Sequence, residues 1–362
     1  MSVPIRSELV GLQAYGAPQI DVPVRLNTNE NPFSPPAALV KAIAKNVSAI
    51  ASDLNRYPDR DATNLRTKLA EYLTRESGVE ISVDQVWAAN GSNEIMLQIL
   101  QTFGGPHRTA LTFGPTYSMY EEYARDTMTN FVSVDRKADF SVDAELVVKA
   151  ISIHRPSVVF LTSPNNPTGT SIDLGVIDAA LKAAPDVLIV VDEAYAEFRR
   201  PGVQSALTRL ASHDNLIVTR TMSKAFAFAG VRLGYMAAAP AIREALMLVR
   251  LPYHLSTVTQ TVAVTALDFA DELQKDLDVI RQERDDLVEW LIQNGFESAQ
   301  SDANFVLFGQ LKDRHATWQA LVDRGVLVRE VGPAGWLRVT IGTPQEMKIF
   351  KEKLLEVKGL TS

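Results

Sequence analysis

Lys224 stands in a segment whose neighbours could turn an amine into a nucleophile. Thr221 and Ser223 precede it, the apolar run 225–230 follows it, and Arg232 comes eight positions later. Apolar surroundings disfavour the charged form of an amine and so lower its pKa. Hydroxyl groups and a guanidinium are donors that suit a phosphate. The segment therefore indicates a reactive amine beside an anion site, and its alternative interpretation is a solvated surface lysine.

An acid and a phenol follow another apolar run. Residues 187–191 form a continuous apolar stretch that ends in Asp192, and Tyr195 comes three positions after it. Ligands of open α/β sheets bind beyond the carboxyl ends of the strands, so Asp192 falls where a ligand would bind. A helix cap after a strand is the alternative.

Two turn segments carry further polar groups. The stretch Ser163–Gly169, with Asn166 at its centre, follows the apolar run 158–161, and Asn90–Asn93 opens a helical pattern. A helix start exposes backbone NH groups at the positive end of the helix dipole, which is an anion site. An ordinary turn and an ordinary helix cap are the respective alternatives.

Composition limits what these segments can belong to. A chain of 362 residues, 46% hydrophobic and 22% charged, is long enough for one large or two medium-sized folded domains. Its 36 basic and 43 acidic residues give a net charge of −7, so no global positive field would gather nucleic acid or an anionic membrane. We therefore expect no nucleic-acid or membrane partner.

Cysteine and histidine usage narrows the classes further. The chain has no cysteine, which excludes disulfides and thiolate metal sites and fits a reducing cytoplasm. Its five histidines show no paired ligand spacing, so we expect no metal and disfavour a metal hydrolase. No apolar run approaches the ~18 residues of a membrane helix, and the first residues lack a continuous apolar core, so we expect neither secretion nor membrane spanning.

The elements that must position these residues are predicted from periodicity. Ser34-Pro35-Pro36 predicts a helix start with a serine cap, and a second helix is expected between Asp61 and Gly78. Short apolar runs then alternate with helical stretches, which favours a mostly parallel α/β sheet covered on both faces. The runs are 109–113, 157–162, 187–191 and 216–219.

The C-terminal part of the sequence predicts a different arrangement of helices and strands. A long amphipathic helix is predicted from about 271 to 294, followed by a terminal helix from about Pro344. Strand candidates between them are 304–308, 326–328 and 336–341. This part is typical of a smaller α+β unit, and since no Pro-, Gly- or Ser-rich linker precedes it, we expect the two units to share an interface.

Taken in order, these motifs resemble those of the fold-type I aminotransferases that depend on pyridoxal phosphate (PLP), and within them the histidinol-phosphate aminotransferases. The resemblance spans nearly the whole chain and implies a large domain with a mostly parallel, seven-stranded type of sheet plus a smaller α+β domain. It assigns 1–50 to an N-terminal arm and first helix belonging to the small domain, 51–270 to the PLP-binding domain, and 271–362 to a connector helix and the small domain. The motifs that carry it are Leu26–Pro32, Arg56–Asp59, Ser163–Gly169, Asp192–Tyr195, Arg220–Lys224 and Ala303–Phe305.

The resemblance implies a role for each cofactor-binding residue. Lys224 would bind PLP covalently and, once the substrate amine displaces it, move a proton between substrate and cofactor carbons. Asp192 would pair with the pyridinium nitrogen and keep it protonated. Asn166 and Tyr195 would hydrogen-bond the ring's phenolic oxygen, and Tyr117 would stack on the ring. The phosphate would be held by Ser92, Asn93, Thr221, Ser223 and Arg232.

Substrates and partners are implied in the same way. Tyr57 would reach the cofactor phosphate from a partner subunit, so we expect a homodimer. Arg338 matches the arginine that takes the α-carboxylate of glutamate, and Arg329 is a candidate for the substrate phosphate or the distal carboxylate of 2-oxoglutarate. Further residues expected near the substrate are Tyr15, Asn29 and Tyr253.

The expected reaction is transamination of L-histidinol phosphate with 2-oxoglutarate to imidazole acetol phosphate and L-glutamate, a step of histidine biosynthesis. Two alternatives share nearly all of these motifs: an aminotransferase of aromatic amino acids, and a PLP-dependent decarboxylase of a phosphorylated amino acid. A regulator or scaffold built on the same fold would not need Lys224, so the intact segment around it argues against that class.

Overall fold

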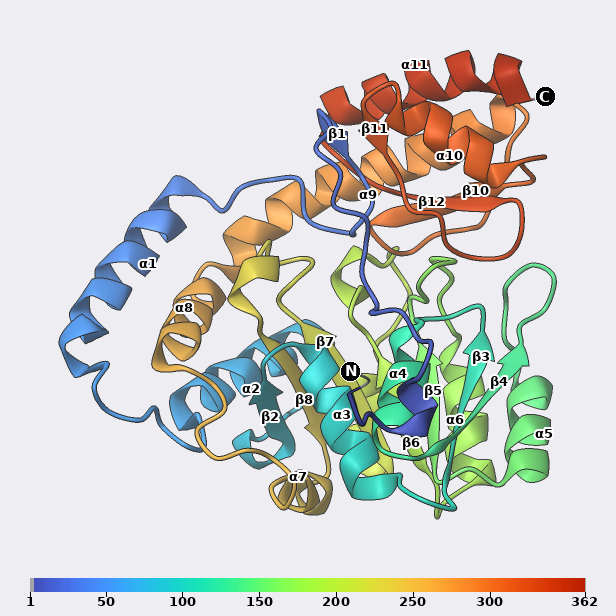
Figure 1. The fold of residues 1–362 in the computed structure, drawn as a ribbon. Coiled ribbons are helices and arrows are strands. Elements are labelled where there is room, and N and C mark those ends of the chain that lie inside the picture. The colour runs from blue at the N-terminus through green and yellow to red at the C-terminus, as the bar shows by residue number, and fades with distance from the viewer. Residues whose placement is uncertain (1–2, 362) are drawn as a thin grey trace.

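A seven-stranded sheet forms the centre of the larger part of the molecule (Figure 1). The computed structural model describes residues 3–361, with the backbone alone for 359–361. The strand order is β2-β8-β7-β6-β5-β3-β4, and only β8 runs against the others, which confirms the expected mostly parallel sheet. The strands are β2 (Val86–Ala89), β3 (Thr109–Gly114), β4 (Asn130–Asp135), β5 (Val158–Thr162), β6 (Leu188–Asp192), β7 (Leu216–Thr221) and β8 (Gly234–Ala238).

Helices cover both faces of this sheet, because successive side chains of each buried strand enter two different cores. On β5, Val158 and Phe160 belong to one hydrophobic cluster, and Val159 and Leu161 belong to the other. The surrounding helices are α2 (Thr63–Ser77), α3 (Ser92–Phe103), α4 (Met119–Asp126), α5 (Ala144–His154), α6 (Leu174–Ala183), α7 (Pro240–Leu246) and α8 (Thr257–Leu267). Continuous apolar runs are therefore what the strands at the centre of the sheet require.

The C-terminal unit begins with the long helix α9 (Ala270–Gln293), close to the predicted 271–294. Its antiparallel sheet contains β9 (Glu297–Ser298), β10 (Phe305–Gly309) and β12 (Trp336–Thr340), and helices α10 (Arg314–Val322) and α11 (Pro344–Thr361) pack beside it (Figure 1). The remaining strand candidate, 326–328, corresponds to β11 (Val326–Leu327), which pairs in parallel with β1 (Val24–Arg25) near the N-terminus.

The segment 3–50 contacts both units. Its strand β1 pairs with β11 of the C-terminal unit, whereas its helix α1 (Ala37–Ile50) packs along α8. The expected serine cap of α1 is wrong: Pro36 occupies the cap position, and no side chain caps the helix. Pro36 keeps Pro35 extended, so the helix can begin only after the second proline.

Short 3-10 helices occupy several connections. They are η1 (Ser7–Leu9), η2 (Ala51–Asp53), η3 (Val83–Gln85), η4 (Ala196–Phe198), η5 (Ala206–Ser212) and η6 (Ala229–Val231).

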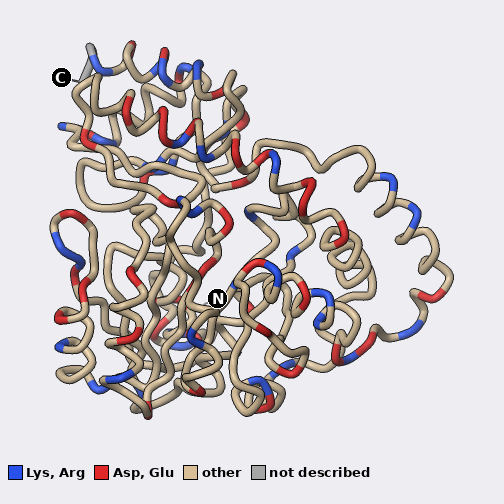
Figure 2. Tube along the Cα trace, turned by 180° about the vertical axis from the view of Figure 1, so that it is seen from behind, with Lys and Arg blue, Asp and Glu red and all other residues tan. Residues whose placement is uncertain are grey.

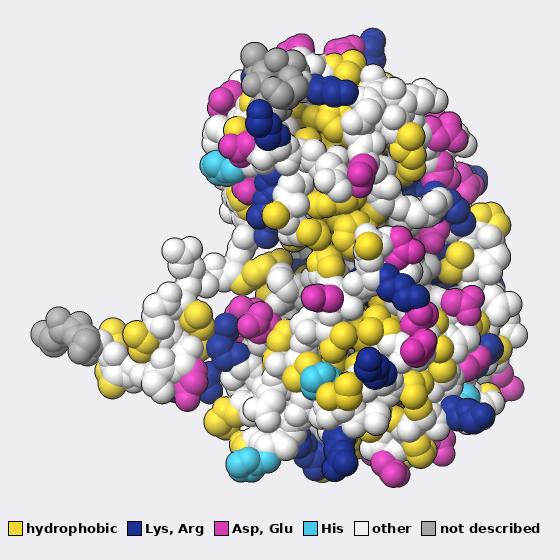
Figure 3. Space-filling model, turned by 90° about the vertical axis from the view of Figure 1, so that its right-hand side faces the viewer, with side chains coloured by type: hydrophobic (Ala, Val, Ile, Leu, Met, Phe, Trp, Pro, Cys, Tyr) yellow, Lys and Arg dark blue, Asp and Glu magenta, His cyan; other side chains and the backbone are white. Residues whose placement is uncertain are grey.

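The surface mixes charges of both signs, and basic and acidic residues are interspersed along the trace (Figure 2). The space-filling view shows the N-terminal segment as an arm that extends away from the body (Figure 3). Between residues 3 and 361, none of the helices is both long and apolar enough to span a bilayer. In the same described part of the chain, no three His, Cys, Asp or Glu residues are grouped as a metal site would need.

Candidate active site

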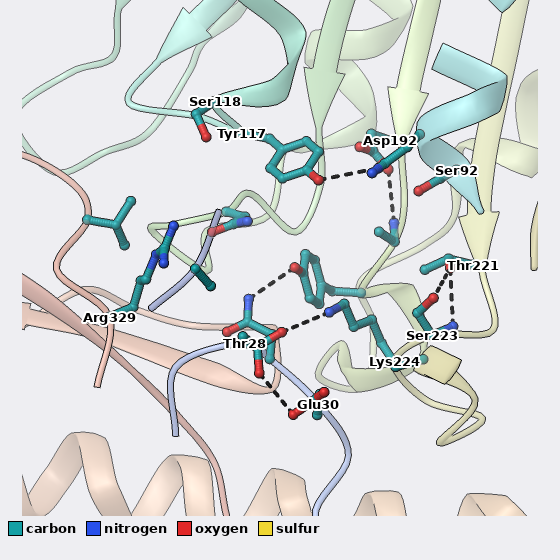
Figure 4. Close-up of a pocket in the computed structure, with 18 of the residues that line it drawn as sticks. Thr28, Glu30, Ser92, Tyr117, Ser118, Asp192, Thr221, Ser223, Lys224 and Arg329 are labelled. Atoms are coloured by element: carbon teal, nitrogen blue, oxygen red, sulfur yellow. Dashed lines mark hydrogen bonds between the residues drawn. The ribbon is translucent and has the colours of Figure 1, made fainter. Parts of the chain in front are cut away.

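A cavity of about 260 Å³ lies where the carboxyl ends of the central strands face the C-terminal unit (Figure 4). Of the sixteen residues singled out from the sequence, all but Tyr57 and Tyr253 line it. Those that line it are Tyr15, Asn29, Ser92, Asn93, Tyr117, Asn166, Asp192, Tyr195, Thr221, Ser223, Lys224, Arg232, Arg329 and Arg338.

Lys224 projects into this cavity from the loop after β7. Its Nζ donates to the backbone carbonyl of Thr28 at 3.1 Å and lies 5.9 Å from the ring centre of Tyr195. Although part of the side chain still faces the cavity, burial of the amine, reinforced by the charge of Arg338, lowers the pKa of Lys224 to about 8. A tenth or so of the amine is therefore neutral, and so nucleophilic, near pH 7.

Asp192 ends β6 at the floor of the cavity and is only 4% exposed. Its Oδ2 accepts a hydrogen bond from the hydroxyl of Tyr120 at 2.7 Å, and its Oδ1 accepts from Thr219 and from the backbone of Ala194, both at 3.2 Å. Burial raises the pKa of Asp192, although these donors oppose the shift. No Lys or Arg of the described chain forms an ion pair with this carboxylate, so it can accept a cationic ligand group.

An anion cradle lies at the start of α3. Gly91 occupies the cap position with a φ of 85°, and a Cβ there would lie 2.7 Å from Arg232 Nη2. Across from it, Thr221 Oγ1 donates to Ser223 Oγ at 3.0 Å, and Arg232 Nη1 approaches the same Ser223 oxygen at 3.4 Å. Backbone NH groups at the helix start beginning at Ser92, two hydroxyls and a guanidinium thus converge, as a bound phosphate requires.

Tyr195 and Asn29 join the large unit to the C-terminal unit across the cavity. Asn29 Nδ2 donates to the Tyr195 hydroxyl at 3.0 Å. The backbone NH of Asn29 donates to Thr340 Oγ1, which itself donates to Asn29 Oδ1, both at 3.0 Å. The phenol is therefore held at a fixed place in the cavity wall, near Lys224 and tied through Asn29 to Thr340 of β12.

Two arginines stand side by side at the opposite end of the cavity. Arg338 is 6% exposed, and its Nη1 and Nη2 donate to Asn166 Oδ1 at 2.5 Å and to the carbonyl of Asn27 at 2.8 Å. Its Nε is buried without a partner in the described structure. Arg329 and Arg338 exchange backbone hydrogen bonds of 2.9 Å, and an Nη of Arg329 donates to the carbonyl of Gly16 at 3.3 Å.

This arrangement favours anionic substrates. Burial lowers the pKa of Arg338 to about 10, which still leaves it cationic at neutral pH. With Arg329, Arg232 and the protonated fraction of Lys224, the cavity carries positive charge at both ends. Two separated anionic groups can therefore bind here, one at each end.

Three tyrosines lie at or beyond the rim of the cavity. Tyr57 is 80% exposed and stacks on Tyr253, with ring centres 4.5 Å apart and planes at 17°, outside this chain's own cavity. Tyr15 lines the mouth from the N-terminal segment and remains half exposed. Inside, the Tyr117 hydroxyl donates to Asn93 Oδ1 at 3.3 Å, so this phenol stands over the start of α3.

Sequence reasoning missed the residues that surround Asp192. Thr162 and Thr219 are its register partners on the neighbouring strands β5 and β7, and Tyr120 reaches it from α4. Tyr120 follows Tyr117 by three positions, but Tyr117 lies before α4, so no helical periodicity could have identified Tyr120 from it. The carbonyl of Thr28, which accepts from Lys224, has no sequence signal because any residue carries a backbone oxygen.

The sequence of this chain matches those of known aminotransferases. Residues 21–354 match the family model described as "Aminotransferase class I and II". The histidinol-phosphate aminotransferase of Thermobifida fusca is 60% identical over 99% of this chain and 96% of its own length. That of Frankia casuarinae is 56% identical over 96% of this chain and 88% of its own.

Solved structures agree in fold. The crystal structure of Sinorhizobium meliloti histidinol-phosphate aminotransferase in complex with pyridoxal-5'-phosphate superposes with a TM-score of 0.84 at 25% identity, covering 94% of this chain and 92% of that one. The aspartate aminotransferase of Thermus thermophilus with maleate gives a TM-score of 0.82 at 24% identity, over 93% of this chain and 92% of that one. The latter likeness concerns the fold alone.

Proposed function

This chain belongs to the class I and II aminotransferase family, and on that premise we propose that it transfers the amino group of L-histidinol phosphate to 2-oxoglutarate, giving imidazole acetol phosphate and L-glutamate. The observation that carries the proposal is one cavity that holds a partly neutral lysine between an anion cradle at one end and two adjacent arginines at the other. The choice of substrate follows the near-full-length relatives, which bear that name. We also propose that it acts in the cytoplasm, the compartment expected from the absence of cysteine.

The residues of the cavity fit pyridoxal phosphate as the cofactor. The cradle at the start of α3 is kept free of side chain by Gly91 and would hold the phosphate. The buried carboxylate of Asp192, which lacks a cationic partner among the described residues, would pair with a protonated ring nitrogen. Lys224 would form the covalent bond. When bound, PLP supplies an aldehyde carbon that combines with amines and a pyridine ring that withdraws electrons.

The protein's own groups would then perform the proton transfers and the positioning. Nζ of Lys224, neutral in part near pH 7, would take the proton that leaves the substrate carbon bearing the amino group. It would then give a proton to the cofactor carbon. Asp192 would stay ionised against the ring nitrogen. Tyr195, fixed by Asn29, would hold its hydroxyl proton near the ring's oxygen.

Arg338 and Arg329 would bind the anionic groups of the two substrates in turn. Arg338, fixed by Asn166 and Asn27, would take the α-carboxylate of glutamate or 2-oxoglutarate, because a planar guanidinium meets a carboxylate with paired hydrogen bonds. Arg329, which is more exposed, would meet the phosphate of histidinol phosphate or the distal carboxylate of 2-oxoglutarate. Tyr15 would cover the bound substrate from the mouth.

A homodimer would complete the site. Tyr57 and Tyr253 stack outside their own cavity, and exposed leucines lie in the same two chain segments: Leu54 at 50%, Leu248 at 85% and Leu251 at 71% exposed. Exposed apolar groups gathered in this way are typical of a subunit interface. We propose that the partner subunit covers them and that Tyr57, accompanied by Tyr253, reaches the partner's cofactor phosphate.

A substrate panel tests the proposal. Purified protein with PLP and 2-oxoglutarate is offered histidinol phosphate, phenylalanine, tyrosine or threonine phosphate, and glutamate and carbon dioxide are measured. We expect kcat/KM for histidinol phosphate to exceed that for the aromatic amino acids by about 100-fold or more, because its phosphate would bind Arg329, whereas an aromatic ring would leave that guanidinium without an anionic partner. Faster glutamate formation from an aromatic amino acid, or carbon dioxide from threonine phosphate, would favour one of the two alternatives instead.

A further inference from the structure

Tyr120 lies behind the cavity rather than in its wall. It is fully buried on α4, its ring stacks on Phe160 with centres 4.6 Å apart and planes at 5°, and the ring of Tyr117 meets it edge-on at 5.6 Å. It is absent from the residues that line the cavity, so it touches neither substrate nor cofactor there. Packing on two sides fixes the direction in which its hydroxyl points.

That hydroxyl connects Asp192 to the neighbouring strand. Tyr120 Oη donates to Asp192 Oδ2 at 2.7 Å and also lies 2.9 Å from Thr162 Oγ1. A phenol has one proton, and an ionised carboxylate can only accept, so Thr162 must donate to the phenol oxygen. The resulting chain, Thr162 to Tyr120 to Asp192, polarises the phenol and strengthens its bond to the carboxylate.

Among the groups around Asp192, Tyr120 makes the shortest contact. The bonds from Thr219 and from the backbone of Ala194, both to Oδ1, are 3.2 Å long. Glu193, the neighbouring acid, has the opposite effect, since its negative charge raises the pKa of Asp192. Burial also raises that pKa, and the bond from Tyr120 is the largest influence that lowers it. Burial and Asp192 in turn raise the pKa of Tyr120 well above its ordinary value, so it stays a neutral donor at physiological pH.

We propose that Tyr120 is a positioning residue whose hydrogen bond weakens the basicity of Asp192, so that the proton between this carboxylate and the cofactor's ring nitrogen stays on the nitrogen. The inference rests on the proposed function through PLP binding alone and not on the identity of the substrate. A proton shared by two bases resides on the more basic one, and a donor to the carboxylate makes the carboxylate the weaker base. The electron-withdrawing power of the ring would thus depend on a tyrosine that the ring never touches.

The test compares Tyr120→Phe with Tyr235→Phe in holoenzyme reconstituted with PLP labelled with ¹⁵N in the ring. Tyr235 is a matched control because it is also fully buried, but its hydroxyl has no partner in the described structure and lies outside the cavity. We expect the ¹⁵N resonance of Tyr120→Phe to move toward that of an unprotonated pyridine and kcat to fall by about 10- to 100-fold, with KM within about threefold. Tyr235→Phe should keep the wild-type resonance and kcat.

The resonance separates this role from simple packing. If Tyr120→Phe keeps a protonated ring nitrogen, the proposal is overturned even where kcat falls, because lost packing alone would explain the fall. If Tyr120→Phe does not accumulate as folded protein, 3-fluorotyrosine at position 120 replaces it. This near-isosteric, more acidic phenol should keep the ring nitrogen protonated to higher pH than in wild type, and a change in the other direction would overturn the proposal.

The measurement needs bound PLP but no substrate. It therefore gives its answer even if the substrate panel favours an aromatic amino acid. Failure of the wild-type protein to bind PLP would instead refute the proposed function itself.

Discussion

At the scale of single residues, the chemistry of this protein depends on two ionisable side chains, Lys224 and Asp192. Burial lowers the pKa of Lys224 and raises that of Asp192, so the charged form of each group is disfavoured. Shifts of this kind cluster at functional sites, because a ligand can relieve them. Here a carbonyl compound would use the neutral amine, and a cationic ring nitrogen would stabilise the charged carboxylate.

The first prediction concerns the pH dependence of Lys224. Its pKa of about 8 means that the neutral fraction of the amine rises about tenfold between pH 7 and pH 9 and then levels, whereas an ordinary lysine would gain about 100-fold over that range. We therefore expect the rate at which apoprotein captures PLP to rise about tenfold and to reach a plateau near pH 9. Stopped-flow absorbance measures this rate, and Nα-acetyl-lysine corrects for the ionisation of PLP itself.

Two controls accompany that measurement. Lys224→Ala should fold, bind PLP without a covalent bond and show no turnover. Borohydride reduction of the loaded wild-type protein should place the label on Lys224, and a label on another lysine would refute the assignment. A rate that keeps rising beyond pH 10 would show that the amine is not desolvated.

The second prediction concerns Asp192. Replacing it by alanine removes the buried carboxylate at the floor of the cavity, so the ring nitrogen should lose its proton and the ring should withdraw electrons less strongly. We expect the rate of the first half-reaction to fall about 10³-fold or more, which corresponds to ~4 kcal/mol of transition-state stabilisation. Single-turnover absorbance measures it, and a variant within about tenfold of wild type would exclude the pyridinium role.

Asp192→Ala should not achieve this loss by unfolding the protein. Because burial raises the pKa of Asp192 in the folded state, its carboxylate reduces folding stability as the pH rises above the unfolded value. Removing it should therefore leave the melting temperature of the apoprotein near pH 7 unchanged or higher. A large fall in melting temperature would point to a structural role.

At the scale of elements, the close approach of β8 to the start of α3 shapes the anion cradle. A Cβ on Gly234 would lie 2.1 Å from the backbone nitrogen of Ser92, so this position admits no side chain. We predict that Gly234→Ala destabilises the fold by roughly 1–3 kcal/mol and weakens PLP binding, because the helix start must move. Thermal unfolding and PLP titration measure both effects.

Gly230 offers the matched control. It lies near the same cradle, but a Cβ on it meets nothing within 4 Å. Gly230→Ala should keep the wild-type melting temperature and PLP affinity. Equal effects of the two alanines would show that the close approach of β8 and α3 does not matter.

The buried strands could be predicted from sequence, whereas the margins of the sheet could not. The four apolar runs correspond to β3, β5, β6 and β7, because strands covered on both faces must be apolar throughout. The edge strand β4 was missed because its polar and half-exposed residues carry no such run. The antiparallel β8 was missed because its sequence, Gly-Tyr-Met-Ala-Ala, owes its place to packing against β2 and β7.

The candidate site also contains residues that could be predicted from the sequence and contacts that could not. Residues that end buried strands or begin a helix, such as Asp192 and Ser92, were visible because the rules for ligand binding refer to those positions. The contacts that tune them were not. Tyr120 lies 72 positions before Asp192 in the sequence, and only the order of the strands brings them together.

At the scale of the whole molecule, one chain leaves its own cavity without Tyr57. The Tyr57–Tyr253 stack and the nearby leucines are exposed, and the N-terminal arm extends from the body with further exposed apolar residues such as Val10 (Figure 3). A single chain gains nothing from such exposure. In a symmetric dimer the same surfaces would be buried, and each cavity would be completed by the other subunit.

The last prediction tests this exchange of residues. Lys224→Ala should be inactive in its own cavity, and Tyr57→Asp should be inactive because it places a negative charge against the partner's cofactor phosphate. Tyr57 is exposed within its own chain, so this charge should not unfold the subunit. In a mixed dimer one cavity would carry both changes and the other neither, so an equal mixture should recover about a quarter of wild-type activity after subunit exchange. Mass spectrometry confirms the exchange; exchange without any recovered activity would mean that Tyr57 serves its own subunit's cavity or none.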